Sequence, residues 1–151
     1  MPLSHVDADG GARMVDVAGK PETAREASAE AFLVVAPATL DALRRGRGPK
    51  GDPTEVARIA ALQAAKRTPE LIPLCHPLRL SSIEVEIEER PPDRLRVFAR
   101  VRAIERTGVE MEALTAVVVG ALTLYDMVKA IDRTAVITDG RVLEKRGGKS
   151  G

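Results

Sequence analysis

Hydrophobic and charged residues alternate along two segments in the middle of the chain. In 81–89, SSIEVEIEE, and in 94–105, RLRVFARVRAIE, apolar residues recur with the period of two that a half-buried strand requires. The intervening PPD favours a turn, so the two segments are predicted to pair as a hairpin. The glutamates of the first strand would then face the arginines of the second, and we interpret these rows as a solvated, salt-bridged face.

Two further segments are predicted to be strands. In 25–36, REASAEAFLVVA, the residues have helix propensity, but small apolar and polar positions alternate and Phe32–Val35 is rich in β-formers. Pro37 then interrupts the pattern, so we favour a strand over a helix. The segment 135–146, AVITDGRVLEKR, is predicted to be the last strand.

Two helices are predicted between the first strand and the hairpin. Residues 37–45, PATLDALRR, form a short helix that Gly46 ends. The sequence DPTE at 52–55 is a helix start, with an N-cap aspartate and a proline in the first turn, and the helix runs to about Arg67. Its predicted packing face consists of Val56, Ile59, Ala60, Gln63 and Ala64.

A long helix is predicted from Thr107 to Asp132. Thr107 and Glu110 fit a capping box, and 116–122 is apolar all round, so solvent should reach little of it. One stripe of this helix carries polar side chains: Glu112, Thr115, Val119, Thr123, Asp126 and, at its edge, Lys129. Two acids and a lysine on a buried helix indicate either a buried ion-pair network or a catalytic face.

The spacing of the two acids on this helix bears on assembly. Glu112 and Asp126 lie fourteen residues apart, roughly 21 Å along a helix axis, so one small pocket in one subunit cannot hold both. Two copies packed antiparallel about a two-fold axis would bring them together, with Val119 at the midpoint and Gly120 allowing close approach. We therefore expect an isologous dimer with sites at its interface. A long ligand that spans both residues within one chain is the alternative.

The predicted order of elements is β-α-α-β-β-α-β. With the two short helices counted as one layer, this order is βαββαβ, the ferredoxin-like arrangement. We expect an α+β fold in which an antiparallel sheet is covered by helices on one face. The 151 residues are enough for a single domain, 1–151, with an irregular arm at 1–19 and a mobile tail at 146–151.

Composition narrows the class of function. A formal net charge of +1 implies no general attraction to nucleic acid or to a membrane, and 2% aromatic residues argue against base-stacking platforms. Cys75 is the only cysteine, which precludes an intrachain disulfide and favours a reducing cytosol. The chain start lacks the basic and apolar regions of a signal peptide, and the apolar run of the long helix is expected to be too short to span a bilayer.

The segment 68–80, TPELIPLCHPLRL, is apolar and stiffened by three prolines, which argue against a regular helix. It presents Cys75 and His76. His76 is either structural or a ligand-facing hydrogen-bond donor or proton shuttle. Cys75 is better explained as a small hydrophobe than as a nucleophile, because no base stands at a diagnostic spacing. No cluster has zinc spacing, since His5 and His76 are the only histidines.

Four lysines and an aspartate complete the candidate residues. Lys50, in GPKGD, is either a phosphate ligand or a plain loop residue. Asp126 and Lys129, three apart on the helix, are predicted to touch, to be partly buried and to be poised for acid–base catalysis. Lys145 and Lys149 flank a glycine pair, in either a solvated tail or a lid that closes over an anion. These residues predict a cytosolic oligomer that binds an anionic small molecule.

Several motifs are long and specific enough to indicate a family. The chain resembles the cyclic pyranopterin monophosphate synthases, the molybdenum cofactor biosynthesis protein C family, in MVDVAGKPETAREASAEAF, LIPLCHPL, TGVEMEALTAV, LTLYDMVKAID and the terminal GGKSG. The resemblance covers nearly the whole chain. It implies a ferredoxin-like fold and a cytoplasmic hexamer, built as a trimer of dimers with active sites at the dimer interface.

The resemblance also implies a reaction. Members of this family are lyases that convert 3′,8-cyclo-7,8-dihydroguanosine 5′-triphosphate to cyclic pyranopterin monophosphate with release of pyrophosphate. By motif, the catalytic residues fall on Asp126, Lys129 and Lys50, and the substrate-binding residues on Leu74, Cys75, His76, Met111, Glu112, Lys145 and Lys149. No cofactor is implied beyond magnesium carried by the substrate triphosphate. A non-catalytic nucleotide-sensing domain of the same fold is the alternative function.

Overall fold

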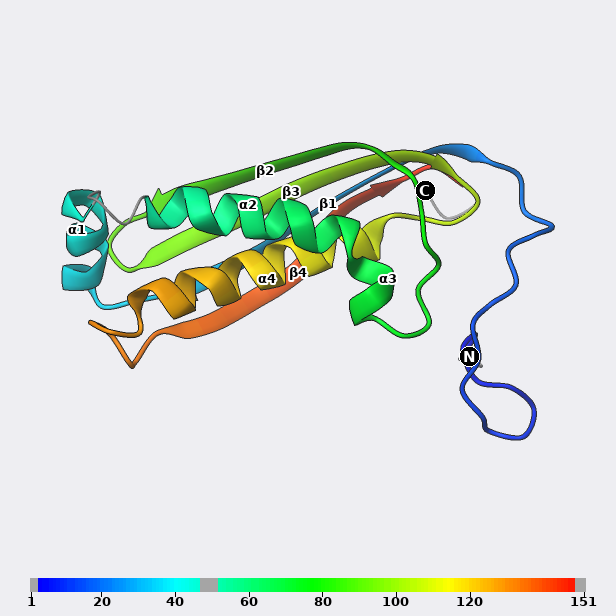
Figure 1. Cartoon of the computed structure of the whole chain (residues 1–151), viewed down its shortest axis with the longest axis horizontal. Helices are drawn as coiled ribbons and strands as arrows, with labels where there is room; N and C mark the ends of the chain where they lie inside the picture. Colours follow the sequence, from blue (N-terminus) through cyan, green and yellow to red (C-terminus); the bar gives the residue numbers. More distant parts are fainter. Residues whose placement is uncertain (1–2, 47–51, 149–151) are drawn as a thin grey trace.

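The protein is a four-stranded antiparallel sheet with helices on one face (Figure 1). The structure is a computed structural model and describes residues 3–46 and 52–148. The strands, in the sheet order β2-β3-β1-β4, are β2 (Leu80–Arg90), β3 (Arg94–Glu105), β1 (Thr23–Val34) and β4 (Val136–Arg146). The helices are α1 (Pro37–Arg45), α2 (Pro53–Lys66), α3 (Thr68–Leu71) and α4 (Glu110–Val128). The predicted α+β class, antiparallel sheet and one-sided helical layer are confirmed.

The first strand is central to the sheet and buried on both faces. Ala27, Ala29 and Ala31 are fully buried in the core under the helices, whereas Ser28 and Glu30, on the opposite face, are 3% and 5% exposed. β1 pairs with β3 along its whole length and with β4 on its other side. Strand is therefore the correct choice for this segment, because pairing on both sides overrides its helix propensity.

Small residues let α4 lie close to the sheet and to α2. A Cβ atom added to Gly120 would come within 2.9 Å of Val97 Cγ1 on β3 and 3.4 Å of Ala61 Cβ on α2. Gly120 thus serves close packing inside one chain, and its predicted place at a helix–helix dimer contact is wrong. Of the predicted packing face of α2, Ala64 is confirmed as buried, but Val56 and Ile59 are wrong because they are 39% and 45% exposed. The buried residues of this helix are Ala57, Ala61, Ala64 and Ala65.

The start of α4 differs from the prediction. The helix begins at Glu110 after Val109, which makes no side-chain cap, so the predicted capping box at Thr107 is absent. The Glu110 carboxylate instead lies 3.5 Å from Lys145 Nζ at the end of β4. The short α3 is a second departure: one helical turn forms at 68–71 because Pro69 stands in its first turn, where a missing N–H is tolerated.

The end of α4 is held by Asp132, which is 6% exposed. Its carboxylate accepts hydrogen bonds from the Ala36 amide and the Thr39 hydroxyl, both at 2.8 Å, and from Thr134 at 2.6 and 2.9 Å. These donors, with Thr134 first, lower the pKa of Asp132 to about 2. Asp132 therefore ties the turn after α4 to the first turn of α1.

The outer face of the sheet carries the charged rows. The predicted pairing across the hairpin is confirmed, for example between Arg102 and Glu84 at 3.1 Å. At the centre, however, Glu30 of β1 bridges Arg96 of β3 at 2.8 Å and Arg141 of β4 at 2.6 Å, and the Glu30 and Arg96 side chains are 7% and 15% exposed. The interpretation as a solvated face holds at the margins and is wrong at the centre, because β1 adds a third row.

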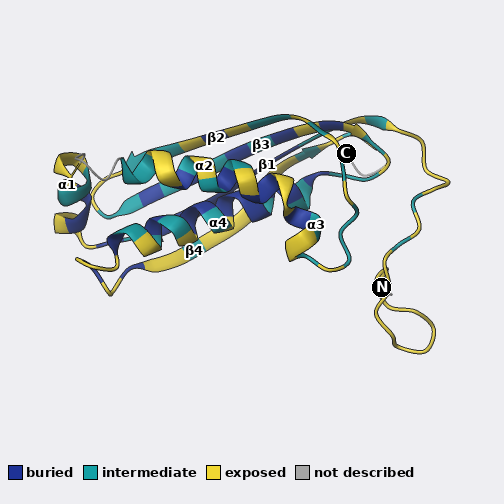
Figure 2. Ribbon diagram, viewed as in Figure 1, coloured by how far each residue is buried: buried dark blue, intermediate teal, exposed yellow. Residues whose placement is uncertain are grey.

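α4 is more apolar and more exposed than predicted. With 19 residues and a mean hydropathy of 1.5, it meets the length and composition of a membrane-spanning helix, contrary to the sequence expectation. Half of it is buried in the fold, however, which is the setting of a core helix (Figure 2). The expectation that 116–122 is shielded all round is wrong, because Val118 and Leu122 are 43% and 54% exposed.

Candidate active site

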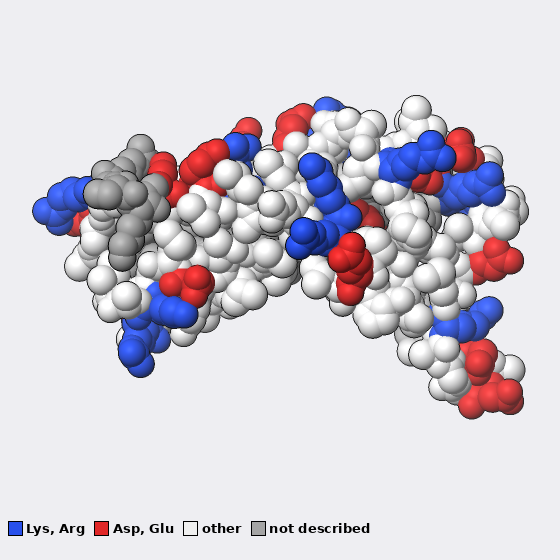
Figure 3. Space-filling view, viewed as in Figure 1, with Lys and Arg blue, Asp and Glu red and all other residues white. Residues whose placement is uncertain are grey.

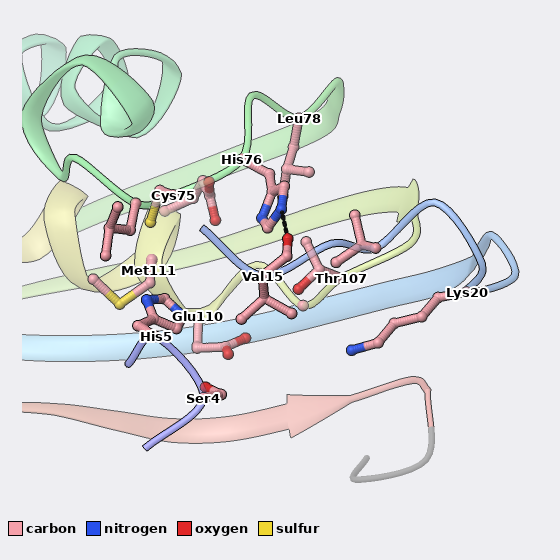
Figure 4. A pocket seen from close by; sticks show the side chains of 14 residues that line it. Ser4, His5, Val15, Lys20, Cys75, His76, Leu78, Thr107, Glu110 and Met111 are labelled. Carbon is pink, nitrogen blue, oxygen red and sulfur yellow. Dashed lines mark hydrogen bonds between the residues drawn. The ribbon is translucent and has the colours of Figure 1, made fainter. Parts of the chain in front are cut away.

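A polar cavity of about 220 Å³ lies at the N-terminal end of α4 (Figure 4). Its walls are the loop after α3, the first turn of α4 and the N-terminal arm, residues 3–22. We call it the acidic pocket, because Glu110 and Glu112 line it. Five residues that the sequence assigns to substrate binding line this pocket together: Leu74, Cys75, His76, Met111 and Glu112.

Glu112 is the most perturbed acid of the acidic pocket. It is 2% exposed, and burial raises its pKa to about 7, with smaller contributions from the charges of Glu110 and Glu105. A carboxyl group with this pKa exchanges a proton near neutral pH. Glu112 can therefore both accept hydrogen bonds from a bound ligand and carry a proton.

Cys75 lies beside these acids. Burial first, and then the charges of Glu112 and Glu110, raise the pKa of the Cys75 thiol. A thiol with a raised pKa remains protonated and is a poor nucleophile. This supports the interpretation of Cys75 as a small, weakly polar wall residue.

His76 contacts the N-terminal arm rather than another ionisable side chain. Its Nε2 lies 2.5 Å from the backbone carbonyl of Val15. Because a carbonyl only accepts hydrogen bonds, Nε2 must carry the hydrogen and donate it. Of the alternatives open from the sequence, this contact supports the structural one, because the hydrogen bond is made to the chain itself.

A basic cavity of about 440 Å³ adjoins the acidic pocket, and we call it the basic pocket. The two share Lys20, Thr107 and Gly108. Its cations come from three segments that are distant in the sequence: Lys20 and Arg25, then Arg106, then Lys145. The Thr23 hydroxyl also lines it and, within the described part of the chain, is buried without a hydrogen-bond partner. Sequence reasoning missed Lys20, Arg25 and Arg106, because no local motif marks them.

The glycine pair after β4 closes one side of the basic pocket. Gly147 and Gly148 have φ of +99° and +66°, in the left-handed region that favours glycine. A Cβ atom at Gly147 would strike the Ala24 carbonyl, and one at Gly148 would strike the Arg25 guanidinium. The pair thus lets the chain lie directly on the start of β1. Lys145 lines the basic pocket from the end of β4, whereas Lys149 lies outside the described residues.

Asp126 and Lys129 lie at the other end of α4. Their carboxylate and ammonium groups are 2.7 Å apart, so the predicted contact is confirmed. The predicted burial is wrong, because the side chains are 65% and 58% exposed. Their apolar neighbours Leu124 and Val128 are fully buried on another side of the helix, and apolar neighbours in sequence therefore do not bury this pair.

The hydrogen bond and charge of Asp126 raise the pKa of Lys129. Lys129 is therefore protonated at neutral pH and suited to donate a proton or to neutralise an anion. It lines a shallow cavity of about 560 Å³ with Tyr125, Ala130 and Arg133. Within one chain this cavity and the acidic pocket are separate, and the third predicted catalytic residue, Lys50, lies outside the described residues.

Metal binding by the protein alone has no evident site in residues 3–46 and 52–148. No three His, Cys, Asp or Glu side chains in these ranges are placed to hold an ion together. In the acidic pocket, Glu112 is buried, His76 donates to the Val15 carbonyl and Glu110 pairs with Lys145. The Glu110 Oε2 atom is nevertheless buried without a hydrogen-bond partner among the described residues.

Comparison with known proteins identifies the family of this chain. The chain is 55% identical over 150 residues to a cyclic pyranopterin monophosphate synthase from Thermomicrobium roseum, which covers 99% of this chain and 90% of that protein. The MoaC family model matches residues 14–148, a range that includes both pockets apart from Ser4 and His5 of the arm. The chain belongs to the MoaC family.

Proposed function

We propose that this protein is a cyclic pyranopterin monophosphate synthase of molybdenum cofactor biosynthesis. As a lyase, it converts 3′,8-cyclo-7,8-dihydroguanosine 5′-triphosphate to cyclic pyranopterin monophosphate and pyrophosphate. Family membership and the named relative support this reaction. The observation that carries the assignment to this site is the pair of adjoining pockets, one acidic and one basic, which suits a ligand with a hydrogen-bond-donating base at one end and a triphosphate at the other.

The acidic pocket suits the reduced guanine ring. The N–H groups along the edge of such a ring need acceptors, and Glu112 is a buried carboxyl group positioned on the wall of this pocket. Met111 and Leu74 supply apolar surface beside it. Ionising a buried carboxyl group that has no charged partner among the described residues is unfavourable, so a ligand that donates to Glu112 relieves a cost that the free protein carries.

The basic pocket suits the triphosphate. A sugar hydroxyl attacks the α-phosphorus, the bond from that phosphorus to the bridging oxygen breaks, and pyrophosphate leaves with the electron pair. Negative charge builds on the leaving group, and Lys20, Arg106 and Lys145 would neutralise it. A magnesium ion, if used, would arrive with the triphosphate rather than in a protein cage.

The Asp126–Lys129 pair and Lys50 are proposed as the catalytic residues. Opening and reclosing the ring requires proton transfers, and a protonated Lys129 beside a carboxylate is suited to donate and recover a proton. Within one chain the pair lies about 21 Å along α4 from Glu112, too far for one ring system. We therefore place the pair of one subunit at the acidic pocket of another.

Exposed apolar side chains support this assembly. Val118 and Leu122 on α4 and Ile137 and Val142 on β4 are 37–54% exposed. β4 is an edge strand beside α4, and a large part of the helical face carries no charged side chain (Figure 3). A surface of this kind is typical of a subunit interface. The proposed assembly is a cytoplasmic hexamer, a trimer of dimers with sites at the dimer interface.

Two measurements test this function. Pyrophosphate release from the cyclised dihydro-GTP should occur with the wild type and be lost in Lys129→Ala at equal folding and assembly. Mixing inactive Asp126→Asn and Glu112→Ala subunits after dissociation should restore about a quarter of wild-type activity, because half of the random dimers would contain one intact site out of two. Binding without release by the wild type would instead indicate a nucleotide sensor, and no recovery on mixing would place each site within one subunit.

A further inference from the structure

The N-terminal arm forms part of the wall of the acidic pocket, although it belongs to no helix or sheet. Ser4, His5, Val15 and Val17 line the pocket from the arm, together with Cys75 and Glu112 from the body of the protein. Figure 4 shows Ser4, His5 and Val15 among the side chains of the pocket. Sequence reasoning assigned no function to this segment. A segment that supplies so much of a pocket must be held in place for the pocket to keep its shape.

The tip of the arm has its own fold. The Asp7 carboxylate accepts hydrogen bonds from the Gly11 amide at 2.8 Å and the Asp9 amide at 3.0 Å. The His5 carbonyl accepts from the Arg13 amide at 2.8 Å. These bonds close residues 5–13 into a small loop, but none of them joins the arm to the body of the protein.

Among the residues that the structure describes, two hydrogen bonds join the arm to the body, besides the ion pair of Glu22 with Arg106 at 3.9 Å. His76 Nε2 donates to the Val15 carbonyl, and Arg106 Nη1 donates to the Ala18 carbonyl at 2.8 Å. The Arg106 bond anchors the base of the arm close to β1. The His76 bond lies between that base and the loop 5–13, so it determines where the loop rests.

The loop rests between two cavities. His5 lines both the acidic pocket and an apolar cavity of about 540 Å³, whose other residues include Ile72, Leu74 and Met111. His5 thus stands at the border of the two cavities. If the loop swung away, the acidic pocket would lose Ser4 and His5 from its wall and would open towards the apolar cavity.

We propose that the arm is a wall of the substrate site and that His76 is a positioning residue, which holds this wall through the Val15 carbonyl. His5 is then a further specificity residue, placed by that bond against the ligand. The proposal rests on the proposed function for its ligand, but the bond between His76 and the arm exists without substrate. To donate to the Val15 carbonyl, residue 76 needs an N–H group, but it need not exchange a proton.

The first test requires no substrate. Arg13 is an exposed trypsin site two residues before Val15, and cleavage there requires the arm to lift. In His76→Phe, which keeps a ring but removes the donor, cleavage after Arg13 should become about tenfold faster. In His76→Gln, whose amide can donate to the same carbonyl, it should stay near the wild-type rate. Cleavage after Arg45 in α1 should be equal in all three proteins. Equal cleavage after Arg13 in all three would overturn the proposal.

The second test measures pyrophosphate release by the same proteins. His76→Phe should raise KM about tenfold, and His76→Gln should restore it, because glutamine supplies the donor without titrating near neutral pH. His5→Ala should raise KM in the wild type but add little in His76→Phe, since the arm is already displaced there. Asp9→Ala, at the exposed tip of the arm, is the matched control and should leave KM unchanged.

The outcomes separate the two proposals. If His76→Gln regains slow cleavage but stays as impaired as His76→Phe in turnover, His76 acts on the substrate directly and the positioning role is overturned. Additive effects of His5→Ala and His76→Phe would overturn the link through the arm. If the wild type releases no pyrophosphate, the proposed function fails, and the cleavage rates alone decide whether His76 holds the arm.

Discussion

Glu112→Gln should make the protein more stable at neutral and alkaline pH. The substitution preserves the shape of a side chain that is 2% exposed, and it removes a carboxyl group whose pKa is raised by burial to about 7. In the unfolded chain the same group has its ordinary pKa of 4.5. The folded state therefore holds a proton that the unfolded state releases, and this linkage determines both the sign and the size of the effect.

The size follows from the two pKa values. Between about pH 4.5 and pH 7 the folded wild type binds more protons than the unfolded chain, so its free energy of unfolding falls as the pH rises. A pKa raised from 4.5 to about 7 corresponds to a loss of about 3 kcal/mol, complete above pH 7. Glutamine does not titrate, so the advantage of Glu112→Gln should grow from near zero at pH 4.5 to about 3 kcal/mol at pH 8.

The measurement is urea unfolding of both proteins at several pH values, at one protein concentration and with no ligand. The difference in free energy of unfolding is compared across the series, with Glu86→Gln on the charged outer face of β2 as the matched control. Glu112→Gln should also bind the substrate more weakly if Glu112 accepts hydrogen bonds from the N–H groups of the reduced guanine ring. A difference between wild type and Glu112→Gln that does not change with pH would refute the reasoning, because it would mean that Glu112 is ionised at no cost in the fold.

Three further predictions concern other parts of the molecule. Asp132→Asn should cost about 2 kcal/mol at pH 7 in urea unfolding, and because the pKa of Asp132 is lowered to about 2, this cost should vanish as the pH falls from about 4 to 2. Gly120→Ala should lower the thermal midpoint by overpacking Val97, at about 1 kcal/mol or more, whereas Gly140→Ala, with its nearest contact at 3.8 Å, should be near neutral. Lys20→Ala should weaken pyrophosphate binding about tenfold in low salt and less in high salt, measured by calorimetry.

Local patterns were sufficient for most of the fold. The hairpin of β2 and β3 and the helices α1 and α2 follow from alternation, proline and capping residues close together in sequence. β1 was harder, because its alternation resembles a half-buried strand while both of its faces are covered. The helices cover one face, and the ion pairs of Glu30 with Arg96 and Arg141 cover the other, so both depend on segments far along the chain.

The candidate site likewise contains residues that local sequence patterns mark and residues that they do not. Cys75, His76 and Glu112 were noticed because they are polar or reactive side chains in apolar surroundings, whereas Leu74 and Met111 followed only from the family resemblance. The basic pocket was not found, because its cations meet only when β4 pairs with β1, which places Lys145 opposite Ala27. The arm was missed for a similar reason, since its place in the wall depends on a backbone carbonyl, which sequence patterns do not mark.

The two ends of α4 differ in ways that bear on why the fold assembles. At the first end Glu112 is buried at a cost and lacks a charged partner among the described residues, while at the other end Asp126 and Lys129 are exposed and paired. The buried Glu112 is suited to bind a ligand in its own subunit, whereas the exposed Asp126–Lys129 pair is accessible to another subunit. A rigid helix keeps the two apart at a fixed distance, so one chain offers a binding site without its acid–base pair. A second copy that supplies the pair would complete both sites at once, and the exposed Val118 and Leu122 lie between them on the helix where such a copy would pack.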